Sequence, residues 1–76
     1  MNNKRRGFLK DAEMYLERAS RIISRVLDEE QDCLDNMPEN LQASENYERM
    51  EAAIDELGDA INSIDSAKEN IDSAKE

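Results

Sequence analysis

The sequence predicts an all-α protein: an antiparallel helical hairpin with coiled-coil-like heptads, which dimerises into a four-helix bundle. Between Tyr47 and Ile71, apolar residues recur at alternating steps of three and four, which is the spacing of a helix that packs along one seam. The 76 residues include only three aromatic residues, two glycines and one proline, which leaves little material for β-strands. A single break at Pro38 divides the chain into two halves of similar length.

The first helix is predicted over about 8–36. Its apolar residues form two sets with similar spacing. The first set defines a seam of Ala12, Tyr15, Ala19, Ile22, Val26 and Cys33. The second set widens that seam with Leu9, Leu16, Ile23, Leu27, Leu34 and Met37. A stripe this broad is typical of a bundle helix and wider than a two-stranded coiled coil requires.

The turn is predicted over about 37–44 and the second helix over about 45–74, within a single domain of residues 1–76. Pro38 has no amide hydrogen and disfavours helical torsions in the residue before it, so the first helix must stop or kink there. Ser44 is the best N-cap for the second helix, because the acidic Glu45 and Glu48 follow in its first turn, where the helix dipole favours anions.

Two helices joined by a short turn pack antiparallel. Both helices carry apolar surface beyond one seam, so we expect a lone hairpin to leave Leu16, Ile23, Leu27 or Leu34 exposed. A two-fold homodimer would cover this surface, as would docking onto a foreign protein. The predicted self-association residues are Leu16, Ile23, Leu27, Leu34, Ile54, Leu57, Ile61 and Ile64.

Charge is distributed unevenly along the chain, whose net charge is −9. Residues 1–25 contain seven lysines and arginines against three acidic residues, a balance of +4. Residues 26–76 contain sixteen acidic residues against three basic ones, a balance of −13, and twelve of those acids lie within 26–59 beside one base. The middle of the chain therefore carries most of the negative field.

A row of carboxylates is predicted along one face of the second helix. Carboxylates three or four residues apart on a helix lie about 5–6 Å apart, comparable with the phosphates along a nucleic-acid strand. Such a row is most often a plain solvated face, yet like charges at this spacing destabilise a helix, and few cations lie between them. The candidate partner-binding residues are Glu48, Glu51, Asp55, Asp59, Asp65, Glu69 and Asp72.

Catalysis, metals and cofactors find no support in the sequence. With one cysteine and no histidine, the chain lacks the ligands of a structural zinc site and the partner for a disulfide. The acids between Asp28 and Asp35 lack the loop that bends oxygens around calcium, and we predict no metal, no cofactor and no catalytic residue. Cys33 falls on the apolar seam, so we expect it in the core.

No segment approaches the roughly 20 apolar residues needed to span a bilayer. The Lys4-Arg5-Arg6 cluster is not followed by the apolar region of a secretion signal. We therefore expect a cytoplasmic protein that does not associate with membranes.

Three segments, 35–42, 50–55 and 60–64, resemble those of a group of short helical-hairpin proteins encoded by phages and mobile elements of gut bacteria. The resemblance covers most of the chain and implies no reaction. The small size and acidity are similar to those of anti-CRISPR and other inhibitors of host defence, which often occupy the nucleic-acid path of an effector. This likeness lies in general character and rests on no motif.

Two functional hypotheses follow. In the first, the protein is a non-enzymatic inhibitor in a bacterial host, and its acidic face binds a basic nucleic-acid-binding protein, for example a Cas nuclease, without contacting nucleic acid itself. In the alternative, it is a structural module for helical assembly or scaffolding with no inhibitory role. Charge reversal on the acidic face would abolish the first activity and leave the second intact.

Overall fold

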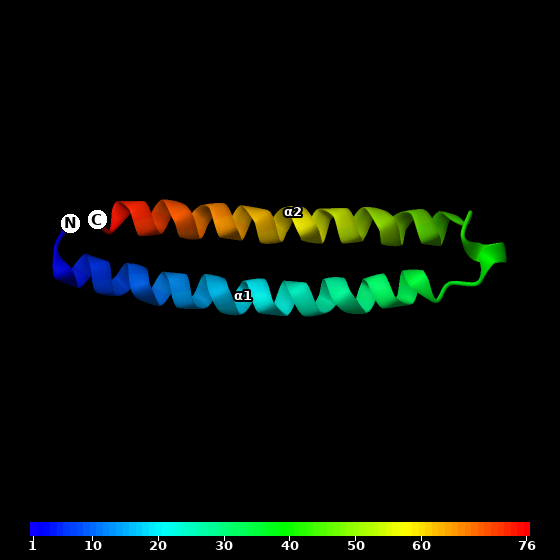
Figure 1. The fold of residues 1–76 in the computed structure, drawn as a ribbon, viewed down its shortest axis with the longest axis horizontal. Coiled ribbons are helices and arrows are strands. Elements are labelled where there is room, and N and C mark those ends of the chain that lie inside the picture. Colours follow the sequence, from blue (N-terminus) through cyan, green and yellow to red (C-terminus); the bar gives the residue numbers. More distant parts are fainter.

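The computed structural model describes all 76 residues and contains two long α-helices and one short 3-10 helix. Helix α1 spans Asn3–Asp35, the 3-10 helix η1 spans Glu39–Leu41, and α2 spans Glu45–Ala74. The two long helices lie side by side in opposite directions, so both termini lie at one end and the turn at the other (Figure 1). The prediction of an all-α antiparallel hairpin is confirmed.

Helix α1 begins at Asn3, five residues before the predicted start at residue 8. The earlier start comes from an N-cap at Asn2. Asn2 has extended torsions, and its side-chain oxygen accepts a hydrogen bond of 2.8 Å from the amide of Arg5. An asparagine in this position satisfies one of the free amides of the first turn. The basic cluster of residues 4–6 is therefore helical.

The turn between the helices follows the chemistry of Pro38. Helix α1 ends at Asp35, and the amide of Asn36 still donates to the carbonyl of Asp32 at 3.1 Å. Pro38 then adopts extended torsions, with φ −58° and ψ 145°. Ser44 caps α2 by accepting a hydrogen bond of 3.2 Å from the amide of Tyr47. Helix α2 accordingly begins at Glu45, where the sequence predicts it.

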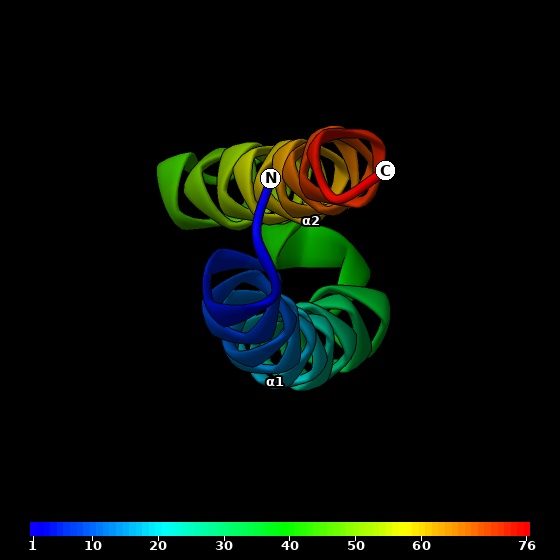
Figure 2. The same cartoon turned by 90° about the vertical axis from the view of Figure 1, so that its left-hand side faces the viewer.

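The hairpin is a thin rod with Cα extents of 59 × 15 × 12 Å. Viewed along the rod, the two helices lie inclined to each other, with the turn behind them (Figure 2). No residue in the rod is fully enclosed. Large apolar residues are half-buried along the interface of the two helices: Leu9, Leu16, Ile23, Leu27 and Leu34 of α1, Met37 of the turn, and Tyr47, Met50, Ile54, Leu57, Ile61, Ile64 and Ile71 of α2.

This arrangement corrects the predicted seam of α1. Leu16, Ile23, Leu27 and Leu34, expected to be exposed in a lone hairpin, are half-buried. The residues that are exposed belong to the set offset from them by one position: Tyr15, Ile22, Val26 and Cys33. Both sets have helical spacing, but the packed set offers six large aliphatic side chains, so its burial removes more apolar surface from water.

Cys33 is a second correction. It was expected in the core, but its side chain is exposed and its thiol is free. The next residue, Leu34, is half-buried instead. Adjacent residues on a helix point about 100° apart, so the choice of Leu34 as a packing residue directs Cys33 away from α2.

Candidate functional site

The acidic row on α2 is accessible along its whole length. All seven predicted partner-binding residues are exposed: Glu48, Glu51, Asp55, Asp59, Asp65, Glu69 and Asp72. Only Asp72 contacts a cation, with an oxygen 3.7 Å from Nζ of Lys75. The other six form no ion pair within the chain and remain available to an external cationic group.

The turn half of the hairpin, residues 26–59, concentrates the negative charge. It contains twelve carboxylates and one base, a balance of −11. That base, Arg49, pairs with Glu45 at 2.7 Å within α2. The other eleven carboxylates form no ion pair, so the field of this half is not neutralised inside the molecule.

The open half, residues 1–25 and 60–76, has a balance of +2 and is bridged by charged groups. Lys68 of α2 forms an ion pair with Glu17 of α1, and Nζ of Lys75 lies 2.6 Å from Oε1 of Glu13. Nε of Arg6 donates a hydrogen bond of 2.8 Å to the carbonyl of Lys75. These contacts tie the C-terminal turns of α2 to α1.

The interhelical ion pairs shift the acid–base behaviour of their members. The hydrogen bond and positive charge of Lys68 hold the pKa of Glu17 below its ordinary value. The same hydrogen bond raises the pKa of Lys68. The hydrogen bond to Glu13 likewise raises the pKa of Lys75, whose side chain is only 17% exposed. Each shift favours the charged forms that make the pair.

The eight residues predicted for self-association lie elsewhere in the hairpin. Leu16, Ile23, Leu27, Leu34, Ile54, Leu57, Ile61 and Ile64 are all half-buried along the interface between α1 and α2. These residues already form the interface within one chain. Their contact with a second chain stays a prediction.

A different apolar surface is exposed on α1. Phe8 and Tyr15 are each 62% exposed, Ile22 is 61% exposed and Val26 is 43% exposed. We call these four residues the exposed stripe. Sequence reasoning assigned three of them to the packed seam and did not assign Phe8. The missed signal is that residues 8, 15, 22, 26 and 33 repeat the spacing of 9, 16, 23, 27 and 34 one position earlier.

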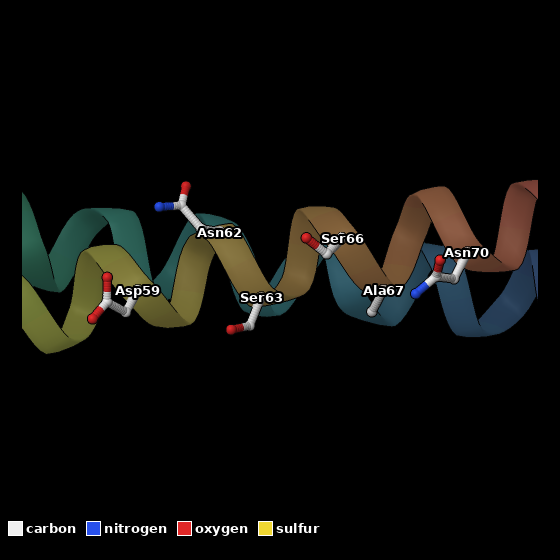
Figure 3. Close-up of a pocket in the computed structure, with 6 residues that line it drawn as sticks. All are labelled: Asp59, Asn62, Ser63, Ser66, Ala67 and Asn70. Atoms are coloured by element: carbon white, nitrogen blue, oxygen red, sulfur yellow. The ribbon is translucent and has the colours of Figure 1, made fainter.

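The rod has one shallow surface hollow, which lies entirely on α2. Its lining residues are Asp59, Asn62, Ser63, Ser66, Ala67 and Asn70. Figure 3 shows these short side chains along one helix, with α1 behind it. No second element closes over them, so the hollow cannot enclose a small molecule as a ligand pocket does.

Neither a metal centre nor a membrane-spanning helix is found in the hairpin. No group of three or more acidic residues or cysteines is arranged to hold a metal ion. Neither helix contains an apolar stretch long enough to cross a bilayer. Comparisons of the chain with protein-family models, with curated proteins and with solved structures find no match.

Proposed function

We propose that the protein is a non-enzymatic acidic binding protein whose α2 carboxylates dock on the basic groove of a nucleic-acid-binding protein and block the entry of DNA or RNA. The observation that carries the proposal is that six of the seven carboxylates in the acidic row of α2 are exposed and have no cation of their own. A polyanionic rod attracts basic clefts at long range and competes with nucleic acid for them.

The shape of the hairpin supports the same proposal. A groove that holds a nucleic-acid strand is long and narrow, and the protein is a rod of 59 Å that is no more than 15 Å across at its Cα atoms. The six unpaired carboxylates of the acidic row lie on the surface of this rod. A partner can therefore reach them without first breaking an ion pair inside the hairpin.

The class of partner follows from its chemistry. It carries rows of lysine and arginine spaced to contact phosphates, as nucleases and other defence proteins that act on foreign DNA or RNA do, a Cas nuclease among them. The proposed setting is the cytoplasm of a bacterial host, and the proposed source is a phage or mobile element.

A matched pair of variants tests the acidic row. The first variant neutralises α2 with Glu48→Gln, Glu51→Gln, Asp55→Asn and Asp59→Asn. The control removes four charges outside α2 with Asp28→Asn, Glu30→Gln, Asp35→Asn and Glu39→Gln. Both variants have the same net charge, so they differ only in which surface is neutral.

The assay measures retention of the nucleic-acid-binding fraction of a bacterial lysate on immobilised protein. We expect wild type and control to retain a nuclease or other nucleic-acid-binding protein, which duplex DNA or high salt releases because electrostatic docking is screened. The α2 variant should lose this retention. Equal retention by all three proteins, or no DNA-displaceable protein on wild type, would contradict the proposal.

A second candidate function, helical assembly or scaffolding, is favoured by the exposed stripe of α1. Four large apolar side chains that are 43–62% exposed are a surface that another helix can cover. In that case Ile61→Asp, which places a charge in the interface of the hairpin, should abolish the activity, while the α2 neutral variant should retain it.

A further inference from the structure

The exposed stripe belongs to a complete second seam on α1. Its positions alternate in steps of four and three over the length of the helix: Phe8, Ala12, Tyr15, Ala19, Ile22, Val26, Glu29 and Cys33. The large members of this second seam are exposed. The other seam of α1, formed by Leu9, Leu16, Ile23, Leu27 and Leu34, is covered by α2. Alternating steps of three and four are the pattern by which one helix packs along another, so α1 has space for a second helical neighbour.

We propose that this second seam is the interface of a two-fold homodimer in which the α1 helices of two copies pack antiparallel. The choice of a second copy as the occupant rests first on charge. The open half of the hairpin has a balance of +2 and the turn half has a balance of −11. Antiparallel packing can place the basic start of each α1, Lys4, Arg5 and Arg6, beside the first acidic residues of the turn half of the other copy, whereas parallel packing would place the two −11 halves together.

The pattern of side-chain sizes selects a register. With the two-fold axis level with Glu17, Phe8 faces Val26 of the second copy, Ala12 faces Ile22, and Tyr15 faces Ala19. Two of these three layers join a large side chain to alanine, and the third joins the ring of Phe8 to a smaller β-branched residue. Large residues opposite small ones fill an interface without voids or overlaps. All four residues of the exposed stripe are used, each twice.

The same register pairs opposite charges. Arg5 faces Glu29 of the second copy, and at the flanking positions Lys4 meets Asp32 and Arg25 meets Asp11. None of these six groups has an ion pair within one chain. The only like-charge contact is between Arg18 and Arg18 of the second copy, at the two-fold axis. Because the pairing is symmetric, each opposite-charge contact occurs twice and the like-charge contact occurs once.

Neighbouring registers are less favourable. Sliding one copy by seven residues in one direction sets Arg18 against Arg25 and Asp11 against Asp32, each twice. Sliding it a further seven residues, fourteen from the proposed register, sets Arg25 against Arg25 of the second copy and moves Phe8 beyond the end of the partner helix. Of these three registers, the proposed one covers the stripe and also neutralises charge.

Dimerisation in this form leaves the acidic row of α2 free. The alanines at positions 53, 60 and 67 each precede a seam position of α2, the last of them occupied by Lys68, as Ala12, Ala19 and Val26 precede seam positions of α1. In an antiparallel pair these two flanks lie on one side of the hairpin. Glu51, Asp65 and Asp72 follow the seam residues of α2 and so lie on the other side, which faces outward in the dimer. The inference is independent of the proposed function.

The first test measures the mass of the purified protein in solution. We expect a species of twice the 8.7 kDa chain mass by sedimentation equilibrium at micromolar concentration, and a monomer for Tyr15→Glu. The matched control is Met14→Glu, because Met14 is 51% exposed and lies next to Tyr15 but outside the second seam. It should remain a dimer. A wild-type monomer throughout the micromolar range, or a dimer that survives Tyr15→Glu, would overturn the proposal.

The second test reports the register and does not depend on an introduced charge. In a Cys33→Ser background, Arg18→Cys places two thiols together across the axis, and mild oxidation should link most chains into a reducible dimer. Arg25→Cys is the control. Residue 25 faces residue 25 of the second copy only in the register shifted by fourteen residues, so this variant should stay unlinked. Both positions are exposed, so both variants should fold. Linking of Arg25→Cys instead, or of neither variant, would overturn the proposed pairing.

Discussion

The two halves of the hairpin are packed alike but charged differently. In the open half, Lys68 and Lys75 reach across to Glu17 and Glu13 and are neutralised there. In the turn half, no ion pair joins the two helices, and the one base pairs within its own helix. The apolar interface is continuous through both halves, with Leu16 and Ile64 in one and Leu34 and Ile54 in the other.

This difference separates the part of the surface that serves the fold from the part that is available to partners. Charged groups in the open half are used to hold the last turns of α2, which carry two nearly identical repeats at 64–70 and 71–76 and would otherwise specify their register weakly. Carboxylates in the turn half perform no such task. They raise the free energy of the folded hairpin through repulsion, a cost that a cationic partner would relieve.

The largest expected loss of stability follows truncation of a leucine in the interface of α1 and α2, and it should be equal in the two halves. Leu16→Ala and Leu34→Ala each remove a half-buried leucine and should lower the free energy of unfolding by about 1–2 kcal/mol, below the 2–5 kcal/mol typical of a fully enclosed residue. Urea unfolding followed by circular dichroism measures both. If Leu34→Ala were neutral while Leu16→Ala was destabilising, the turn half would not be packed and the comparison would fail.

The two glycines give the next largest effect. Gly58 lies inside α2 and Gly7 lies near the start of α1, and a Cβ atom at either position would meet nothing within 4 Å. Gly58→Ala should therefore raise the free energy of unfolding by about 1 kcal/mol, from helix propensity alone. Gly7→Ala should give a smaller gain, because the ends of helices fray. Equal gains in thermal melts would show that the start of α1 is as ordered as the middle of α2.

Removal of one acid from each half should reveal the repulsion in the turn half. Asp55 has like charges four residues away on both sides, Glu51 and Asp59, so Asp55→Asn should stabilise the protein by about 0.5 kcal/mol at low salt. Asp65→Asn is the control, since the repulsion from Glu69 is offset by Lys68, and it should be neutral. The gain should vanish at high salt through screening; a gain that persists would have another cause.

The smallest effect concerns pH and the open half. The pKa of Glu17 is lower in the folded chain than the ordinary glutamate pKa of 4.5. Its ion pair therefore stabilises the protein above pH 4.5, and this contribution is lost as pH falls through the lower pKa of the folded state. The pKa values of Lys68 and Lys75 are raised instead. Their contribution to stability is complete below pH 10.5, the ordinary lysine pKa, and is lost as pH rises through the higher pKa values of the folded state.

Thermal melts at intervals between pH 3 and pH 5, and again above pH 10, measure this dependence. Glu17→Gln should flatten the acid limb of the stability profile, and Lys75→Gln should flatten the alkaline limb. Profiles that are identical in shape to that of wild type would mean that the interhelical pairs contribute nothing to stability, and the two halves would then differ in charge alone.

Much of the hairpin could be predicted from local sequence. The break at Pro38, the cap at Ser44 and the start of α2 at Glu45 depend on residues within a few positions of each other, and the structure places them as predicted. The cap at Asn2 is equally local, and it starts α1 five residues before the predicted position. The exposed acidic row of α2 also follows from spacing along one helix.

Sequence by itself determined that this protein consists of two helices with a sharp break, an unequal division of charge and two candidate seams on the first helix. Only the tertiary structure decided which seam packs, which residues of α1 remain exposed and which lysines find glutamates. The physical reason is that the two seams of α1 are offset by one residue and share the same spacing, so local periodicity cannot distinguish them. The distinction comes from contact with α2, whose Lys68 meets Glu17 from 51 positions further along the chain.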